Sequence, residues 1–98
     1  MKVKVAVVQD SPVFFNKEAT FKKIETICIS KALKGCQLIV FPESFIPGYP
    51  RGLSFGTTIG KRTETGKQQF AEFYNNSFDL ESNDLTRLET LCNEQNIF

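Results

Sequence analysis

Residues 38–52 carry the strongest structural signal in this chain, and they read Leu38-Ile39-Val40-Phe41-Pro42-Glu43-Ser44-Phe45-Ile46-Pro47-Gly48-Tyr49-Pro50-Arg51-Gly52. The first four residues form an unbroken apolar run, which is typical of a buried strand. A proline ends the run, and a carboxylate follows at once. Because open α/β sheets hold their chemistry at the carboxyl ends of the strands, Glu43 is a candidate functional residue. Behind it, Tyr49, Pro50 and Arg51 either shape a substrate pocket or only order the loop, and Arg51 could equally form an internal ion pair.

A strand and a helix are expected before this stretch. Residues 3–9 are rich in β-branched side chains and predict a strand. Asn16 is a good helix N-cap and Gly35 is a good residue just past a helix end, so a helix is expected over residues 17–34. The next strand covers residues 37–41. A strand, a helix and a strand with short connections form a right-handed crossover, so the two strands should be parallel neighbours.

The second half of the chain predicts a long loop and two more helices. Residues 42–66 hold all but one of the prolines and show no periodicity, which is typical of a functional loop. A short helix is expected over residues 65–77, and a last helix should begin after a cap at Ser82 or Asn83. Ile97-Phe98 reads as a strand cut short after two residues. The predicted fold class is therefore α/β, in the order β-α-β-loop-α-α followed by a truncated strand.

Composition excludes several classes of function. Hydrophobic residues make up 41% and charged residues 23% of the chain, which is ordinary for a soluble globular protein. The net charge is +1 and the two signs are interleaved, so there is no electrostatic case for binding nucleic acid or an anionic membrane. No apolar run approaches the ~20 residues of a membrane-spanning helix. The first residues lack a signal-peptide core, so a cytoplasmic location is expected.

Three cysteines and a complete lack of histidine limit the chemistry further. Without histidine, the usual zinc sites and any Ser-His-Asp or Cys-His arrangement are excluded. Cys28 and Cys92 lie on the apolar stripes of predicted helices, and Cys36 lies just before the second strand. We therefore expect all three to be reduced thiols that pack as small hydrophobic groups.

Two motifs give the chain a resemblance to a known family. Phe41-Pro42-Glu43, and Gly48-Tyr49-Pro50-Arg51-Gly52 with Phe55-Gly56, make nearly all of the chain similar to the N-terminal third of nitrilases, in the carbon–nitrogen hydrolase superfamily. The second motif resembles the branch that takes organic nitriles. The resemblance implies that residues 1–98 are an incomplete domain with the α-β-β-α sandwich fold. It also implies no metal or organic cofactor, and a homo-oligomer for the complete protein.

The resemblance further implies a Glu-Lys-Cys triad that acts on a small-molecule nitrile. In such enzymes the cysteine thiolate attacks the nitrile carbon and forms a thioimidate, and water then releases ammonia and the carboxylic acid. By motif position, Glu43 would be the general base, which takes the thiol proton and later activates water. Phe41 and Phe45 would give it apolar surroundings, in which a carboxylate becomes a better base.

The other two members of that triad have no counterpart in this chain. Cys28 and Cys36 precede the glutamate, and Cys92 falls within a helical stripe, so none matches the position of the nucleophile. Lys61 and Lys67 lie in a polar stretch with no match to the lysine motif. We therefore expect the 98-residue chain alone to be inactive.

Two alternatives to a nitrilase fragment stay open. The complete enzyme could act on amides, because the same triad handles both substrates. The chain could instead be a catalytically inactive module that binds a partner subunit, in which case it should be stable by itself. Open edges on a short parallel sheet argue against that stability, since such sheets normally have both faces covered. We expect the isolated chain to aggregate or to stay molten.

Overall fold

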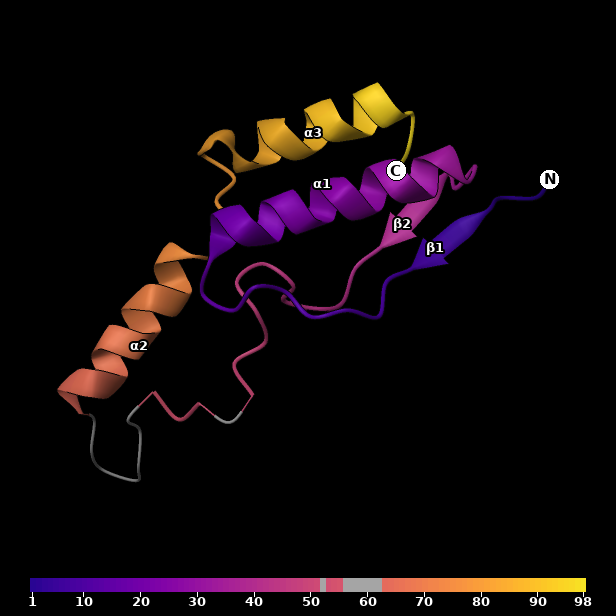
Figure 1. Ribbon diagram of the computed structural model, residues 1–98. Coiled ribbons are helices and arrows are strands. Elements are labelled where there is room, and N and C mark those ends of the chain that lie inside the picture. The colour runs from indigo at the N-terminus through magenta and orange to yellow at the C-terminus, as the bar shows by residue number, and fades with distance from the viewer. Residues whose placement is uncertain (52, 56–62) are drawn as a thin grey trace.

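The computed structural model describes residues 1–51, 53–55 and 63–98, and its elements follow the predicted β-α-β-α-α order (Figure 1). They are β1 (Val5–Val7), α1 (Lys17–Leu33), β2 (Leu38–Val40), α2 (Glu64–Asn75) and α3 (Asn83–Gln95). The α/β class is confirmed. Between β2 and α2 the described residues form turns and irregular backbone, as predicted, while the rest of that predicted loop, 52 and 56–62, lies outside the described residues.

The two strands pair in parallel, as the crossover predicts, with Val5, Ala6 and Val7 opposite Leu38, Ile39 and Val40. Both are shorter than the predicted 3–9 and 37–41. Pairing reaches one residue further at each end, through hydrogen bonds from Val8 N–H to the Val40 oxygen and from Gln37 N–H to the Lys4 oxygen, each 2.8 Å long. The apolar runs therefore mark the right segments, but they extend beyond the residues that have a partner on the neighbouring strand.

Phe98 lies along the edge of β2 that faces away from β1. Its N–H donates to the Gln37 oxygen (2.9 Å), and its oxygen accepts from Ile39 N–H (2.8 Å). This pair of bonds has the pattern of a parallel ladder. Ile97-Phe98 is too short to form a strand of its own, yet its pairing is that of the strand expected there. β2 is therefore bonded along both edges.

Helices α1 and α3 lie side by side and cover one face of the strands (Figure 1). The buried residues between the helices and the sheet form one cluster: Val8, Ile24, Cys28, Cys36, Ile39, Phe45, Leu91 and Ile97. Along each strand, every second side chain points to the opposite face of the sheet, away from the helices. These side chains belong to Val5, Val7, Leu38 and Val40, and they are between 37% and 73% exposed. The sheet is thus half covered, with four apolar side chains on its open face.

Local signals account for the helix boundaries. The Asn16 side chain accepts from Ala19 N–H (3.0 Å) at the start of α1, and Gly35 takes a positive φ of +82° just past its end. Thr63 and Ser82 cap α2 and α3 in the same way. Within the described part of the chain, no helix has the length and apolar character needed to cross a membrane.

Two polar contacts join the helices. Arg87 on α3 donates to Glu25 (2.5 Å) and Glu18 (2.7 Å) on α1, and its guanidinium lies 4.8 Å from the centre of the Phe21 ring. Lys17 Nζ, at the start of α1, donates to the Asp84 carboxylate (2.8 Å). These contacts join particular residues of the two helices. They therefore favour one position of α3 along α1, which apolar packing alone specifies less closely.

Candidate active site

Glu43 lies three residues beyond β2, at the carboxyl end of the strand, as predicted. It opens a turn in which Ser44 has a positive φ of +53° and Gly48 N–H donates to the Ser44 oxygen (2.9 Å). The next side chain, Phe45, is buried and lies 5.2 Å from Phe41, ring centre to ring centre. Phe45 thus anchors the turn to the core, and the Glu43 side chain is left on the outer side.

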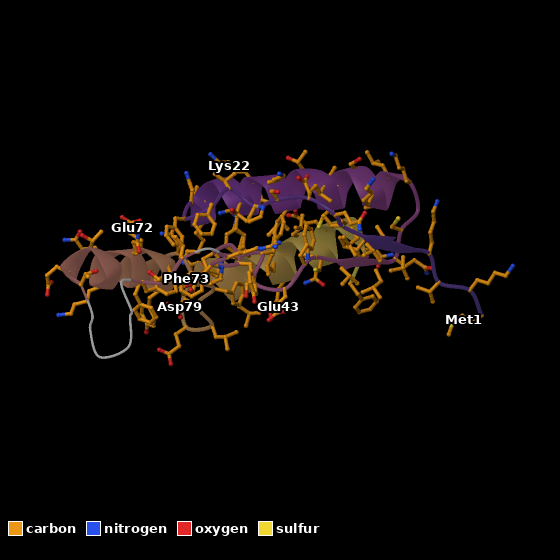
Figure 2. All side chains as sticks on the ribbon, turned by 90° about the horizontal axis from the view of Figure 1, so that it is seen from below. Met1, Lys22, Glu43, Glu72, Phe73 and Asp79 are labelled. Carbon is orange, nitrogen blue, oxygen red and sulfur yellow. The ribbon has the colours of Figure 1, made fainter. Side chains whose placement is uncertain are left out.

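The surroundings of Glu43 differ from the apolar environment expected from the sequence. Its side chain is exposed, and Figure 2 shows it at the edge of the molecule opposite α1. No hydrogen bond or ion pair between described residues involves its carboxylate. The physical reason is that Phe41 and Phe45 pack against each other and toward the core instead of covering the carboxylate. This segment alone therefore does not desolvate Glu43.

The predicted pocket residues lie on the surface of the loop that follows. Tyr49 and Arg51 are exposed, and Pro50 is partly buried. Arg51 N–H donates to the Tyr49 oxygen (2.8 Å), so these residues form a tight local turn. Among the described residues no carboxylate lies within 4 Å of the Arg51 guanidinium, and the internal ion pair considered for it is absent there. Among the described residues, no hydrogen bond or ion pair joins any of these three side chains to Glu43.

An apolar cavity of about 370 Å³ lies behind the Glu43 turn. Ser44, Phe45 and Ile46 line it on the side of the turn, and residues of β2, α1 and α3 together with Phe41, Phe78, Ile97 and Phe98 complete the lining. Besides apolar residues, its lining includes Ser44, Cys28 and Cys92. The cavity therefore offers apolar surface but no acid, base or cation for catalysis.

The cysteines have the environment of structural thiols. Cys28 and Cys36 are buried, Cys92 is partly buried, and all three are free. Burial, with a smaller contribution from Cys92, raises the pKa of the Cys28 thiol to about 11. Since the thiolate is the reactive form, Cys28 is a poor nucleophile at neutral pH. That none of the three cysteines is the nucleophile stays a prediction.

The two lysines that follow Glu43 differ in what the structure shows of them. Lys67 pairs with Glu64 on α2 (2.8 Å), and Lys61 lies outside the described residues. Over residues 1–51, 53–55 and 63–98, no three His, Cys, Asp or Glu side chains gather closely enough to hold a metal ion.

Gly48 makes a close contact that the sequence does not reveal. Its φ is +107°, and a Cβ built on it would lie 2.4 Å from Cδ2 of Phe14. That separation is far below van der Waals contact. The Phe14 ring in turn stacks on Phe15, with ring centres 4.2 Å apart. A Cβ therefore fits at this point of the loop only if the Phe14 ring moves.

We expect Gly48→Ala to lower the free energy of unfolding by about 2–4 kcal/mol, from the positive φ and the clash together. Gly35→Ala is the matched control, since Gly35 also has a positive φ but an added Cβ would meet nothing within 4 Å. It should lose only about 1–2 kcal/mol. Thermal unfolding midpoints of the complete protein compare the two variants, and adding Phe14→Ala to Gly48→Ala should restore part of the loss. Equal midpoints for both glycine variants would show that the ring moves aside freely.

Comparison with known proteins decides the family. Residues 4–98, almost the whole chain, match the family model described as carbon–nitrogen hydrolase. The chain belongs to the carbon–nitrogen hydrolase family. The similarity inferred from Phe41-Pro42-Glu43 and the glycine-rich motif after it is thus confirmed at the level of the family.

Several curated relatives of this carbon–nitrogen hydrolase chain are plant nitrilases. It is 38% identical over 96 residues to proteins named Bifunctional nitrilase/nitrile hydratase NIT4B from Lupinus angustifolius and from Nicotiana tabacum. It is 36% identical over 95 residues to Nitrilase 3 from Arabidopsis thaliana. These alignments cover 97–98% of this chain but only 27–28% of each relative. The chain therefore spans little more than a quarter of the length of the curated relatives it matches.

Sequence reasoning located Glu43 in this carbon–nitrogen hydrolase but missed the residues that hold its turn in place. Phe14 and Phe15 precede α1, and Phe15 N–H donates to the Pro47 oxygen (3.2 Å). These residues lie about thirty positions from the turn in sequence. The sequence shows only two adjacent aromatic residues between the end of a strand and a helix cap. That pattern does not indicate that they contact Pro47 and Gly48.

Proposed function

We propose that this chain is the N-terminal portion of a nitrilase, and that the complete protein converts an organic nitrile and water to a carboxylic acid and ammonia. Glu43 is the general base of a Glu-Lys-Cys triad whose lysine and cysteine belong to the remainder of the protein. The observation that carries the proposal is a solvent-facing carboxylate at the carboxyl end of β2, in a segment 38% identical to proteins named nitrilases.

In the proposed reaction, Glu43 takes the proton of the cysteine thiol, and the thiolate attacks the nitrile carbon to form a thioimidate. Glu43 then activates a first water, which adds to the thioimidate carbon and displaces ammonia to leave a thioester. A second water, activated in the same way, releases the carboxylic acid and frees the thiol. The lysine cation stabilises the negative charge that develops on nitrogen. A base must be reachable by its proton donor, and the exposed, unpaired state of Glu43 in the described residues supports this role. The covering that desolvates it would come from the rest of the protein.

The names of the relatives favour nitriles over amides as the substrate. Two relatives are called nitrilase/nitrile hydratase, which describes action on a nitrile that ends in an acid or an amide. Hydrolysis of amides is the alternative, since the same triad would attack an amide carbon. A homo-oligomer in the cytoplasm remains part of the proposal for the complete protein.

The proposal is tested by comparing the complete protein with residues 1–98. We expect the complete protein to release equal amounts of ammonia and carboxylic acid from an organic nitrile, and residues 1–98 alone to release neither. An antibody against residues 1–98, followed by intact mass, gives the size of the native product. A native product of 11.1 kDa with a sharp, reversible melt would contradict the proposal and favour a module that binds a partner subunit.

A further inference from the structure

We propose that Phe14 is a positioning residue for Glu43, and that the connection between β1 and α1 sets the place of the general base. This inference rests on the proposed function, because it concerns the same carboxylate. It is carried by a chain of contacts that runs from a buried residue of α1 to the turn that Glu43 opens.

The first step is the rigidity of the β1–α1 connection. Thr20 of α1 is completely buried, and its hydroxyl accepts from Val13 N–H (3.1 Å) and donates to the Val13 oxygen (3.0 Å). Asn16 N–H donates to the same oxygen (3.0 Å). The segment before Asn16 is therefore tied to the first turn of α1 at both the donor and the acceptor of Val13. Phe14 and Phe15 project from a fixed backbone.

The second step is the contact between this segment and the loop. Phe15 N–H donates to the Pro47 oxygen (3.2 Å), and the Phe14 ring lies directly against Gly48. Because Phe14 also stacks on Phe15, the ring cannot turn away without disturbing that pair. Two neighbouring residues of the connection thus hold two neighbouring residues of the loop.

The third step carries the constraint to Glu43. Gly48 N–H donates to the Ser44 oxygen (2.9 Å), which closes the turn directly after Glu43. Phe45 anchors the inner side of the same turn in the core. Glu43 has no partner of its own among the described residues, so the backbone of this turn sets the point from which its side chain extends. Releasing Phe14 removes the ring that packs on Gly48, and leaves the Phe15–Pro47 hydrogen bond and the buried Phe45 to hold the turn.

Phe70, the last ring in a series of contacts that runs from Phe15 through Phe73 and Phe55, supplies a control. Phe70 of α2 lies 5.7 Å from Phe55, ring centre to ring centre, and is 52% exposed. It makes no ring contact with Phe14 or with Phe45 among the described residues. Phe70→Ala therefore removes an aromatic ring of the same size that makes no direct ring contact with Phe14, Phe15 or Phe45 among the described residues.

The test measures kcat, KM and the pH profile of kcat/KM for nitrile hydrolysis in the complete enzyme, per mole of folded protein from gel filtration. Phe14→Ala should lower kcat about ten- to a hundredfold with KM changed less than about threefold, because a small misplacement of a catalytic group is enough for such a loss. The acid limb of the profile, which reports the base, should move. Phe14→Leu should recover much of kcat, and Phe70→Ala should match the parent enzyme.

If Phe14→Ala yields no folded protein, Phe14→Leu and Phe14→Val provide the same test, and kcat should fall in that order at nearly constant KM. Parent values of kcat and an unmoved acid limb in Phe14→Ala, beside an inactive Glu43→Gln, would overturn this inference and leave the proposed function standing. A fully active Glu43→Gln would overturn the proposed function, and this inference with it.

Discussion

Glu43→Gln is expected to lower kcat of the complete enzyme for nitrile hydrolysis by about 10²–10⁴-fold, the contribution of a general base. The amide cannot accept the thiol proton, and it cannot activate water. The substitution should leave the fold unchanged, because the Glu43 side chain is exposed and has no hydrogen-bond or ion-pair partner among the described residues. The measurement is steady-state release of ammonia, with circular dichroism and gel filtration to establish that the variant is folded.

A matched control for this substitution is available on α2. Glu72 is exposed and its carboxylate takes part in no ion pair among the described residues, so Glu72→Gln makes the same chemical change away from the turn. Its kcat should equal that of the parent. Glu43→Asp keeps a base but shortens its reach, and an intermediate kcat is expected. If Glu43→Gln and Glu72→Gln are equally active, Glu43 is not the base.

Phe21→Ala is expected to have the largest effect on stability, a loss of about 3–5 kcal/mol in the free energy of unfolding. The Phe21 side chain is 1% exposed, lies near Phe78, and supports the Arg87 guanidinium that joins α3 to α1. Truncation therefore creates a cavity and removes the aromatic face beneath a cation. The shift in the thermal unfolding midpoint of the complete protein measures the loss.

Leu33→Ala is the control for this second variant. Leu33 is the last residue of the same helix and is 84% exposed, so its truncation should change the free energy of unfolding by less than about 0.5 kcal/mol. Equal midpoints for the two variants would mean that Phe21 is not part of the packed core of the folded protein.

The ends of α1 and the pairing of the strands could be predicted from the sequence because each follows from a pattern of residues that can be recognised along the chain. Asn16 and Gly35 mark the ends of α1 because a side-chain acceptor and a positive φ are needed at those points. The parallel pairing of β1 with β2 follows from a single helix between two apolar runs. The lengths of the strands could not be read in this way, because they depend on which residues find a partner across the ladder.

The candidate site could be predicted only in part, for a different reason. Glu43 follows directly from its place after an apolar run, and that place is local information. Its exposure, and the support of its turn by Phe14 and Gly48, depend on contacts between segments about thirty residues apart. No periodicity or cap encodes such a contact. The exposure of Tyr49 and Arg51 likewise depends on how distant segments pack, and it could not be predicted from the local sequence.

The two hydrogen bonds between Phe98 and β2 also set the order in which this region can be completed on the ribosome. One edge of β2 can bond to β1 as soon as β2 is made. The other edge can bond only after Phe98 has been added, roughly 60 positions later. At about 5–20 residues per second, that interval lasts roughly 3–12 seconds. During it the nascent chain presents an unpaired edge of apolar residues, which other chains can join. Slower translation between β2 and Phe98 should therefore increase aggregation of the newly made protein.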